Sequence, residues 1–117
     1  MNHARNHLAG MAAEDSVLRD YTAKGYRLLE RRFRGQGGEI DLVLGRGDDV
    51  IFVEVKKSRS FDTARARLGQ RQILRIFNAA AEFLGGQPKG QLTETRFDLA
   101  LVNAHGEVAV MENALWP

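Results

Sequence analysis

The sequence predicts an α/β domain with a mixed sheet of about five strands, flanked by an N-terminal helix and a helix that crosses between two strands. The chain has 117 residues, which suits one domain. Its apolar residues make up 44% and its charged residues 27%, a composition that favours folding over disorder. Its hydrophobic pattern also changes period along the chain, in the order helix, three strands, helix, two strands.

The first third of the chain reads as a helix followed by two strands. Over residues 7–24, apolar side chains recur at three- and four-residue steps, which predicts an amphipathic helix. Residues 26–33 are expected to form a strand, and the glycine-rich segment 34–38 a turn. Residues 39–44 alternate strictly. This alternation places Ile40, Leu42 and Leu44 on one face and Glu39, Asp41 and Val43 on the other.

The turn at 45–49 leads into a strand over 50–57, which begins with residues that are apolar on both faces, as in a central strand. The later part of that strand places Glu54 and Lys56 on the face of Phe52.

The second half predicts one amphipathic helix over 63–84, ending at two glycines, and two short strands over 96–102 and 107–111. The helix would cross over to join strands 50–57 and 96–102 in parallel.

Composition excludes several classes of protein. Without cysteine, the chain has no disulfide, zinc–thiolate site, iron–sulfur cluster or cysteine nucleophile, and it suits a reducing cytoplasm. No apolar run is long enough to span a bilayer, and residues 1–16 lack the apolar segment of a signal peptide. We therefore expect a cytoplasmic, single-domain protein over 1–117, with residues 1–7 and 113–117 flexible.

The charge is concentrated in the middle of the chain. The net charge is only +2, but residues 24–75 carry thirteen basic against seven acidic side chains, a net of +6, and the remainder carries four against eight, a net of −4. A basic segment of this kind suits contact with a phosphate backbone, although arginines also simply solvate exposed surfaces. The candidates for contact with nucleic acid are Arg34, Lys57, Arg59, Arg71 and Arg75.

Acidic residues interrupt the apolar pattern at three places. Glu14 falls on the apolar stripe of the first helix, where a carboxylate is costly to bury unless it is paired or bound to a cation. The alternative is a residue at the edge of the stripe that reaches solvent or pairs with an arginine. Glu39 and Asp41 lie one strand repeat apart, as do Glu54 and Lys56. A Glu-x-Lys pair in a strand is most often an exposed cross-strand ion pair.

Considered together, these acids suggest a metal site. Asp41 and Glu54 flank the same turn, so a hairpin would bring them opposite or diagonal to each other. Two adjacent carboxylates raise each other's pKa unless a cation lies between them. Oxygen ligands suit Mg²⁺ or Mn²⁺, and the chemistry that follows is metal-assisted phosphodiester hydrolysis. Lys56 would orient the attacking water or stabilise the transition state.

Other chemistries lack parts. The three histidines are scattered, and two of them lie near the N-terminus. The glycines at 35–38 fit neither the spacing of a phosphate-binding loop nor that of a dinucleotide-binding loop.

The chain resembles a known family in three ordered blocks: GEIDLV at 38–43, FVEVK at 52–56 and RFD at 96–98. These blocks resemble the small bacterial YraN-like proteins, which are related to archaeal Holliday-junction resolvases and to the restriction-endonuclease-like, PD-(D/E)XK nuclease fold. The resemblance covers residues 8–111. It implies Asp41 and Glu54 as metal ligands with the main-chain carbonyl of Val55, Lys56 as the catalytic lysine, and Glu14 as an accessory acid.

Two positions depart from the family pattern. Ser58 stands where the family usually has an arginine, and Gln72 stands where a basic residue usually opens the second helix. Both departures affect contacts with phosphate more than metal ligation.

The leading hypothesis is a Mg²⁺- or Mn²⁺-dependent endonuclease acting on DNA in repair or recombination, with branched DNA as the favoured substrate and a homodimer to match the symmetry of a junction. The first alternative is a catalytically silent nucleic-acid-binding domain with the same fold. The second is a structural or partner-binding domain in which the acids pair with arginines.

Overall fold

The computed structural model describes residues 3–115, with side chains from Gly10 onward. Its strands begin and end within two residues of the predicted positions. The elements in chain order are α1 (His3–Ala23), β1 (Arg27–Arg34), β2 (Glu39–Arg46), β3 (Asp49–Lys57), α2 (Phe61–Arg67), α3 (Gln70–Leu84), the short 3₁₀ helix η1 (Gly90–Leu92), β4 (Thr95–Val102) and β5 (Val108–Met111).

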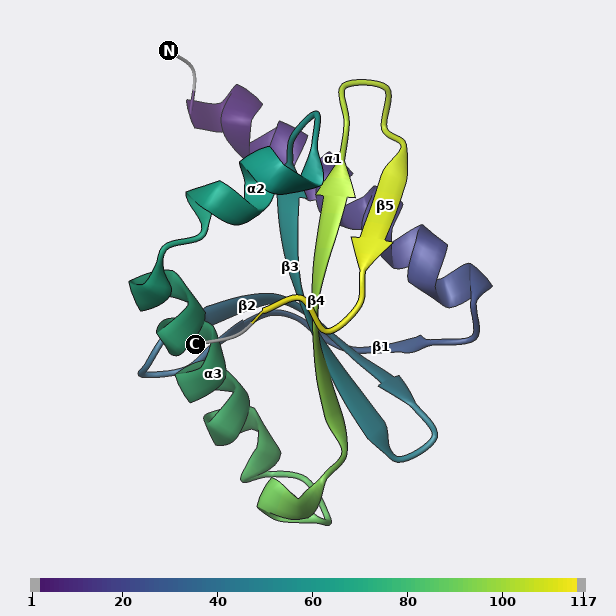
Figure 1. The fold of residues 1–117 in the computed structure, drawn as a ribbon. Coiled ribbons are helices and arrows are strands. Elements are labelled where there is room, and N and C mark those ends of the chain that lie inside the picture. Colours follow the sequence, from purple (N-terminus) through teal and green to yellow (C-terminus); the bar gives the residue numbers. More distant parts are fainter. Residues whose placement is uncertain (1–2, 116–117) are drawn as a thin grey trace.

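The five strands form one mixed sheet in the order β1-β2-β3-β4-β5. β3 and β4 run parallel, and every other neighbouring pair is antiparallel. The parallel pair requires a crossover, which the chain makes through α2 and α3 (Figure 1). The predicted α/β class and parallel crossover are therefore confirmed, and the architecture is consistent with a restriction-endonuclease-like core.

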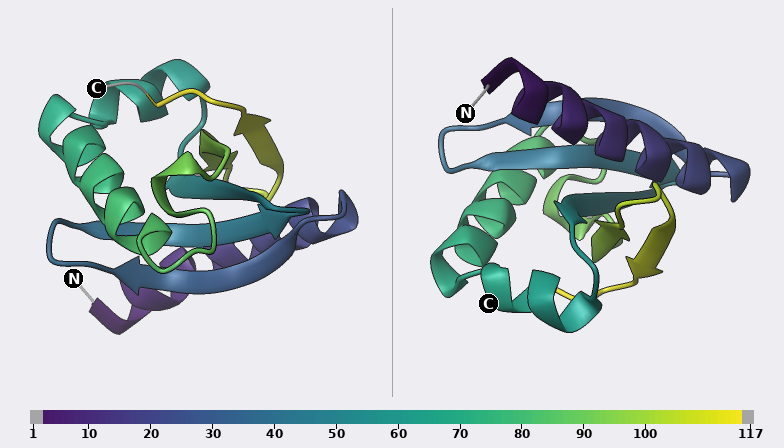
Figure 2. Two further views of the ribbon diagram at one scale, coloured as in Figure 1. Left: turned by 90° about the horizontal axis from the view of Figure 1, so that it is seen from below. Right: turned by 90° about the horizontal axis from the view of Figure 1, so that it is seen from above.

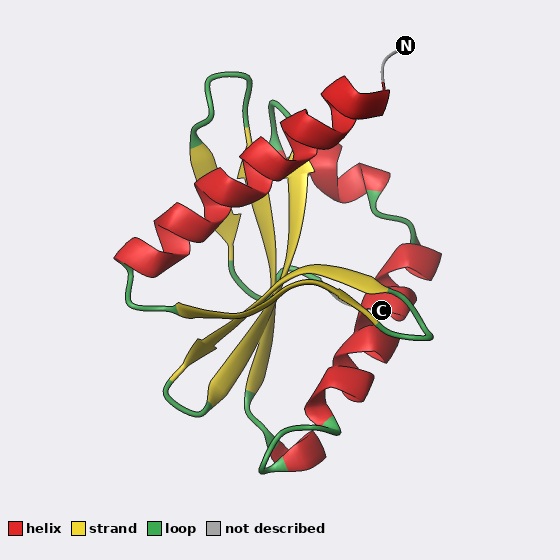
Figure 3. Cartoon of the chain, turned by 180° about the vertical axis from the view of Figure 1, so that it is seen from behind, coloured by secondary structure: helices red, strands yellow, loops and turns green. Residues whose placement is uncertain are grey.

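Helices cover both faces of the sheet: α1 lies on one face, and α2 and α3 lie on the other (Figures 1 and 3). Side chains of the central strands alternate between the two layers, as the pleat of a doubly covered sheet requires. The cluster under α1 includes Val17, Tyr21, Leu42, Val53 and Ala100. The cluster under α2 and α3 includes Phe52, Ala64, Ile73, Ile76 and Leu99.

The prediction of one continuous helix over 63–84 is wrong. The chain forms two helices, because Leu68 and Gly69 both adopt extended backbone conformations between α2 and α3. The Ser60 hydroxyl caps α2 by accepting the Thr63 N–H at 3.2 Å, which starts the first helix ahead of the predicted position. Leu68 is buried in the core, so the break directs an apolar side chain inward.

The strict alternation predicted for residues 39–44 is also wrong at one position. Leu42 and Leu44 pack under α1 as a pair, but Ile40 packs with Val43 in the cluster under α3. The pairing of β2 with β3 ends at Leu42↔Val53, whereas its pairing with β1 continues to Glu39. The first residues of β2 therefore stay paired with β1 and move away from β3. As a result, Ile40 turns toward α3 instead of α1.

The loop between β1 and β2 is anchored on α3 (Figure 2). Glu82 accepts the backbone N–H groups of Gln36 at 3.0 Å and Gly37 at 3.3 Å. A Cβ atom at Gly38 would lie 2.6 Å from the Arg75 carbonyl oxygen. The predicted turn at 34–38 thus needs glycine because a helix backbone lies directly against it.

At the C-terminal end, residues 113–115 are attached to β4, although the sequence led us to expect flexibility at 113–117. The Asn113 N–H donates to Asp98 at 2.9 Å, the Ala114 N–H donates to the Phe97 carbonyl at 2.9 Å, and Leu115 is buried. Residues 1–2 and 116–117 of the segments expected to be flexible lie outside the described part of the chain. Among the described helices, none has the length and apolar character needed to cross a membrane.

Candidate active site

The two predicted ligands meet where β2 and β3 separate. The antiparallel ladder ends at Leu42↔Val53, and the next residues toward the open end are Asp41 and Glu54. There, the Asp41 carboxylate accepts the backbone N–H of Val55 at 2.8 Å. The Asp41 side chain thus replaces the main-chain acceptor that a continued ladder would offer to Val55. The two carboxylates lie together in the gap between the strands at Asp41 and Glu54, which we call the opening, and the predicted hairpin places them there.

Glu54 is buried and Asp41 is half-buried, and this burial disfavours the ionisation of both carboxyl groups. Burial, and then the neighbouring charge of Asp41, raise the pKa of Glu54 to about 8. Burial likewise raises the pKa of Asp41, although the Val55 N–H opposes this rise, and the charge of Glu14 adds to it. Glu54 is only 6% exposed. Such a pair holds a proton or a cation in preference to two bare charges.

Glu54 has two further partners, which both bind its Oε2 atom. The Lys56 ammonium lies 3.2 Å from that oxygen, and the Gln72 amide donates to it at 2.8 Å. Lys56 follows one strand repeat after Glu54, whereas Gln72 reaches it from the first turn of α3. The predicted trio of Asp41, Glu54 and Lys56 is therefore brought together, with Gln72 as an addition.

In the sequence, Gln72 stands out only as a departure from the pattern of the YraN-like proteins. A signal for its position was nevertheless present, because it lies one helical turn before Ile76 and so shares the buried face of α3. A polar residue on that face needs a polar partner, and Glu54 provides it.

The fourth predicted residue, Glu14, faces arginines. It is buried on α1, and its Oε1 accepts the Nε–H groups of Arg31 and Arg32, each at 3.1 Å. Arg31 also donates to Asp15 at 2.7 Å and to the Met11 carbonyl at 3.0 Å. Of the alternatives that the sequence left open for Glu14, the structure shows arginine pairing.

Arg32 reaches Glu14 through an unusual backbone conformation. Its φ is +56°, in the left-handed region that costs a non-glycine residue about 1–2 kcal/mol. Consecutive side chains of a regular strand point to opposite faces, so this conformation allows Arg31 and Arg32 to reach the same carboxylate. Neither arginine was a predicted site residue, and the sequence carries no signal for the left-handed conformation.

The predicted nucleic-acid contacts come from four segments. Arg34 at the end of β1 is paired with Glu39 at 2.9 Å. Lys57 ends β3, Arg59 lies before α2, and Arg71 and Arg75 stand one turn apart on α3. These last four side chains form no ion pair with a carboxylate of residues 10–115, and three of them, all but Lys57, lie on or beside the helices that cover the Glu54 face.

The RFD block at 96–98 lies outside this site. The Arg96 guanidinium donates two hydrogen bonds to the Asp98 carboxylate, at 2.8 and 2.9 Å, and Asp98 is fully buried under α1. Phe97 stacks between Phe52 and Phe77 on the other face. The block therefore stabilises the core.

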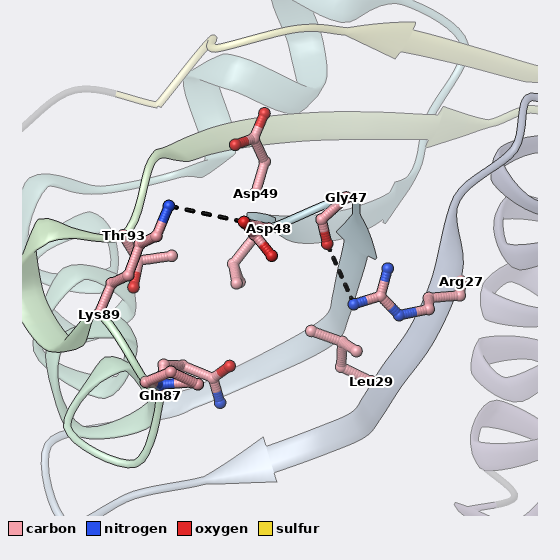
Figure 4. Close-up of a pocket in the computed structure, with 10 residues that line it drawn as sticks. Arg27, Leu29, Gly47, Asp48, Asp49, Gln87, Lys89 and Thr93 are labelled. Carbon is pink, nitrogen blue, oxygen red and sulfur yellow. Dashed lines mark hydrogen bonds and ion pairs between the residues drawn. The ribbon is translucent and has the colours of Figure 1, made fainter.

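The hollow drawn in Figure 4 is also distant from the carboxylate pair along β3. It has a volume of about 330 Å³ and lies beside the β2–β3 turn. Arg27 donates to the Gly47 carbonyl at 3.2 Å, and Lys89 lies 3.6 Å from Asp48. The sequence predicted no site there.

Within the described residues, no group of three or more acidic, histidine or cysteine side chains is arranged to hold a metal ion. The protein donors available at the opening are thus two carboxylates and main-chain carbonyls. A site with so few protein ligands suits Mg²⁺, which usually keeps several waters.

Comparison with known proteins identifies relatives along nearly the whole chain. The model of the uncharacterised protein family UPF0102 matches residues 13–102. A UPF0102 protein of Ruegeria pomeroyi is 59% identical over 110 residues, which cover 94% of this chain and 89% of that protein. A UPF0102 protein of Cereibacter sphaeroides is 53% identical over 109 residues, which cover 93% of each chain. One from Roseobacter denitrificans is 52% identical over 107 residues, which cover 92% of this chain and 83% of that protein.

Proposed function

The chain belongs to the uncharacterised protein family UPF0102, the YraN family predicted from its sequence blocks, and we propose that it is a Mg²⁺- or Mn²⁺-dependent endonuclease that hydrolyses phosphodiester bonds in DNA. One observation carries the proposal: Asp41 and Glu54 converge where β2 and β3 separate, with Lys56 on the Glu54 carboxylate. The family description assigns no activity, so the proposal depends on these residues.

The donor set fits a divalent cation. Glu54 is buried, Asp41 beside it is half-buried, and the pKa of each is raised, so a positive charge placed between the two carboxylates would stabilise their charged forms. Together with the main-chain carbonyl of Val55, they would hold the ion. A bound Mg²⁺ or Mn²⁺ would lower the pKa of a water molecule and neutralise charge on the phosphate.

Three further residues around the carboxylate pair, Lys56, Gln72 and Glu14, have roles of their own. Lys56 carries a positive charge at the edge of the pair, where it can orient the attacking water or stabilise negative charge on the phosphate. Gln72 holds Glu54 from the α3 side. Glu14, the accessory acid, adds negative charge near Asp41 and aligns two guanidinium groups.

The substrate that we propose is branched DNA in repair or recombination. The basic side chains Lys57, Arg59, Arg71 and Arg75 supply the charge for a phosphate backbone. A junction has two-fold symmetry, so an enzyme that cuts it symmetrically would act as a C2 dimer.

The test is cleavage of a labelled four-way junction with Mg²⁺ or Mn²⁺. We expect the wild-type protein to cut it and an Asp41→Ala/Glu54→Ala variant to lose the activity. Glu39→Ala is the matched control, because Glu39 lies on the same strand but pairs with Arg34 outside the opening. Equal cleavage by the wild type and the double variant would show that the activity is a contaminant or that the site is wrong.

A second candidate is a nucleic-acid-binding domain without turnover. This candidate is favoured by Ser58, which stands where the YraN-like proteins usually have an arginine. The Ser58 hydroxyl donates to the Ser60 carbonyl at 3.0 Å. Binding of the junction that is unaffected by EDTA, with no product after long incubation, would favour this function.

A further inference from the structure

The backbone of Arg32 lies on the strand next to Asp41. It falls between the register pairs Arg31↔Leu42 and Phe33↔Ile40, so it is across the β1–β2 ladder from Asp41. Its left-handed backbone, with φ at +56°, turns its side chain toward α1, where Glu14 holds its Nε atom. Strained backbone of this kind persists only where the surroundings enforce it, and it is concentrated at functional sites.

Arg31 and Arg32 share Glu14 but differ in their remaining donors. Arg31 uses all three nitrogens of its guanidinium group, on Glu14, Asp15 and the Met11 carbonyl, and its side chain is 25% exposed. Arg32 uses only Nε, its side chain is 37% exposed, and its two Nη atoms have no partner among the described residues. All three guanidinium nitrogens of Arg31 are therefore occupied by bonds within the protein, whereas the two Nη atoms of Arg32 present four N–H groups to solvent.

From this geometry, and resting on the proposed function, we propose that Arg32 binds a backbone phosphate of the nucleic acid beside the Asp41–Glu54 opening. The two Nη atoms of a guanidinium group form a planar fork that matches two phosphate oxygens. Glu14 occupies the Nε side of the group, so this fork is the edge left for an anion. Because Glu14 already orients the group, little side-chain freedom is lost when phosphate binds.

The test is the affinity for a fluorescent four-way junction, measured by anisotropy in EDTA at several salt concentrations. The informative variant is Arg32→Asn, because asparagine tolerates left-handed backbone while the guanidinium, its bond to Glu14 and the end of the alkyl chain are removed. We expect binding about tenfold weaker than that of the wild type, and a salt dependence reduced by about one phosphate contact. Arg32→Lys should give an intermediate loss, since it keeps the charge but not the fork.

The matched control is Arg27→Asn. Arg27 lies on the same strand as Arg32, and its substitution removes the same positive charge. Its side chain, however, lines the hollow beside the β2–β3 turn. We expect its affinity to stay within about twofold of the wild type, with an unchanged salt dependence.

Two results would overturn the inference, and they differ from each other. If the wild type binds the junction and Arg32→Asn binds it equally well with the same salt dependence, Arg32 is only a partner of Glu14. If the wild type binds no nucleic acid, the proposed function fails and the inference fails with it. Thermal melting checks that Arg32→Asn is folded, and Arg32→Gly, which also allows the left-handed backbone, replaces it if it is not.

Discussion

The hydroxyl of Tyr21 on α1 donates a 2.7 Å hydrogen bond to Oδ2 of Asp98 in β4. Asp98 is fully buried and also accepts bonds from Arg96 and from the Asn113 backbone. Burial, helped by the charge of Asp98, raises the pKa of Tyr21 far above its usual value, so Tyr21 remains a donor. One carboxylate thus joins the C-terminal half of α1, the fourth strand and the segment after β5.

We predict that removing this carboxylate strongly destabilises the protein. Asp98→Ala leaves the Tyr21 hydroxyl without its acceptor and leaves Arg96 with only the Tyr26 hydroxyl and the exposed Glu112, and should lower the free energy of unfolding by about 3–5 kcal/mol. Tyr21→Phe removes one hydrogen bond and should cost about 1–2 kcal/mol. Urea denaturation measures both. Asp48→Ala is the control, because Asp48 forms only an exposed pair with Lys89, and a loss at position 98 no larger than this control would contradict the prediction.

We also predict that Glu54 makes the protein less stable as the pH rises. Its pKa is about 8 in the folded state and 4.5 in the unfolded chain, so between these values the folded state keeps a proton that the unfolded state releases. The contribution of Glu54 is fully present below pH 4.5 and is lost as the pH rises through 8. Relative to Glu54→Gln, the wild type should lose on the order of 5 kcal/mol across this window in EDTA.

Other carboxylates titrate in the acid part of this window, so the measurement is the difference between the two proteins at each pH. The prediction is contradicted if their unfolding free energies remain parallel from pH 5 to pH 8.5. Glu39→Gln should follow the wild type, since Glu39 lies outside the opening.

A third prediction concerns the contact between the β1–β2 loop and α3. Gly38→Ala places a Cβ atom 2.6 Å from the Arg75 carbonyl oxygen, where neither backbone can give way cheaply. We expect a loss of about 2 kcal/mol or more in unfolding free energy, because the loop must move off the helix. Gly69→Ala is the control: its Cβ would meet nothing within 4 Å, so it should lose only the preference of the α3 N-cap for glycine over alanine, about 1 kcal/mol or less. Equal stability of the two variants would mean that the loop is not held on α3.

The central pair of the candidate site was predictable because it depends on local rules. A short turn between two strands forces an antiparallel hairpin, and residues at matched distances from the turn then meet. Asp41 and Glu54 follow from this alone. The sheet order and the parallel crossover follow similarly from the sequence of periodic segments.

The remaining features depend on contacts between distant segments. Many arginines could have paired with Glu14, and the choice of Arg31 and Arg32 is made by the left-handed backbone at Arg32. The break at Gly69 was hidden because apolar residues on both sides of it keep a helical spacing. Gln72 meets Glu54 only because that break sets where α3 begins.

The last prediction is that a divalent cation stabilises the protein through the carboxylate pair. A cation bound between the two carboxylates offsets the cost of their negative charges, so at pH 8, 10 mM MgCl₂ or MnCl₂ should raise the melting temperature by about 5 °C over NaCl of equal ionic strength. Asp41→Asn/Glu54→Gln should abolish the rise, because it leaves no charge to neutralise, whereas Glu39→Gln should retain it. Differential scanning calorimetry measures all three. A rise of the same size in the double variant would place the cation elsewhere on the protein, and no rise in the wild type with either ion would contradict a metal site at the carboxylate pair.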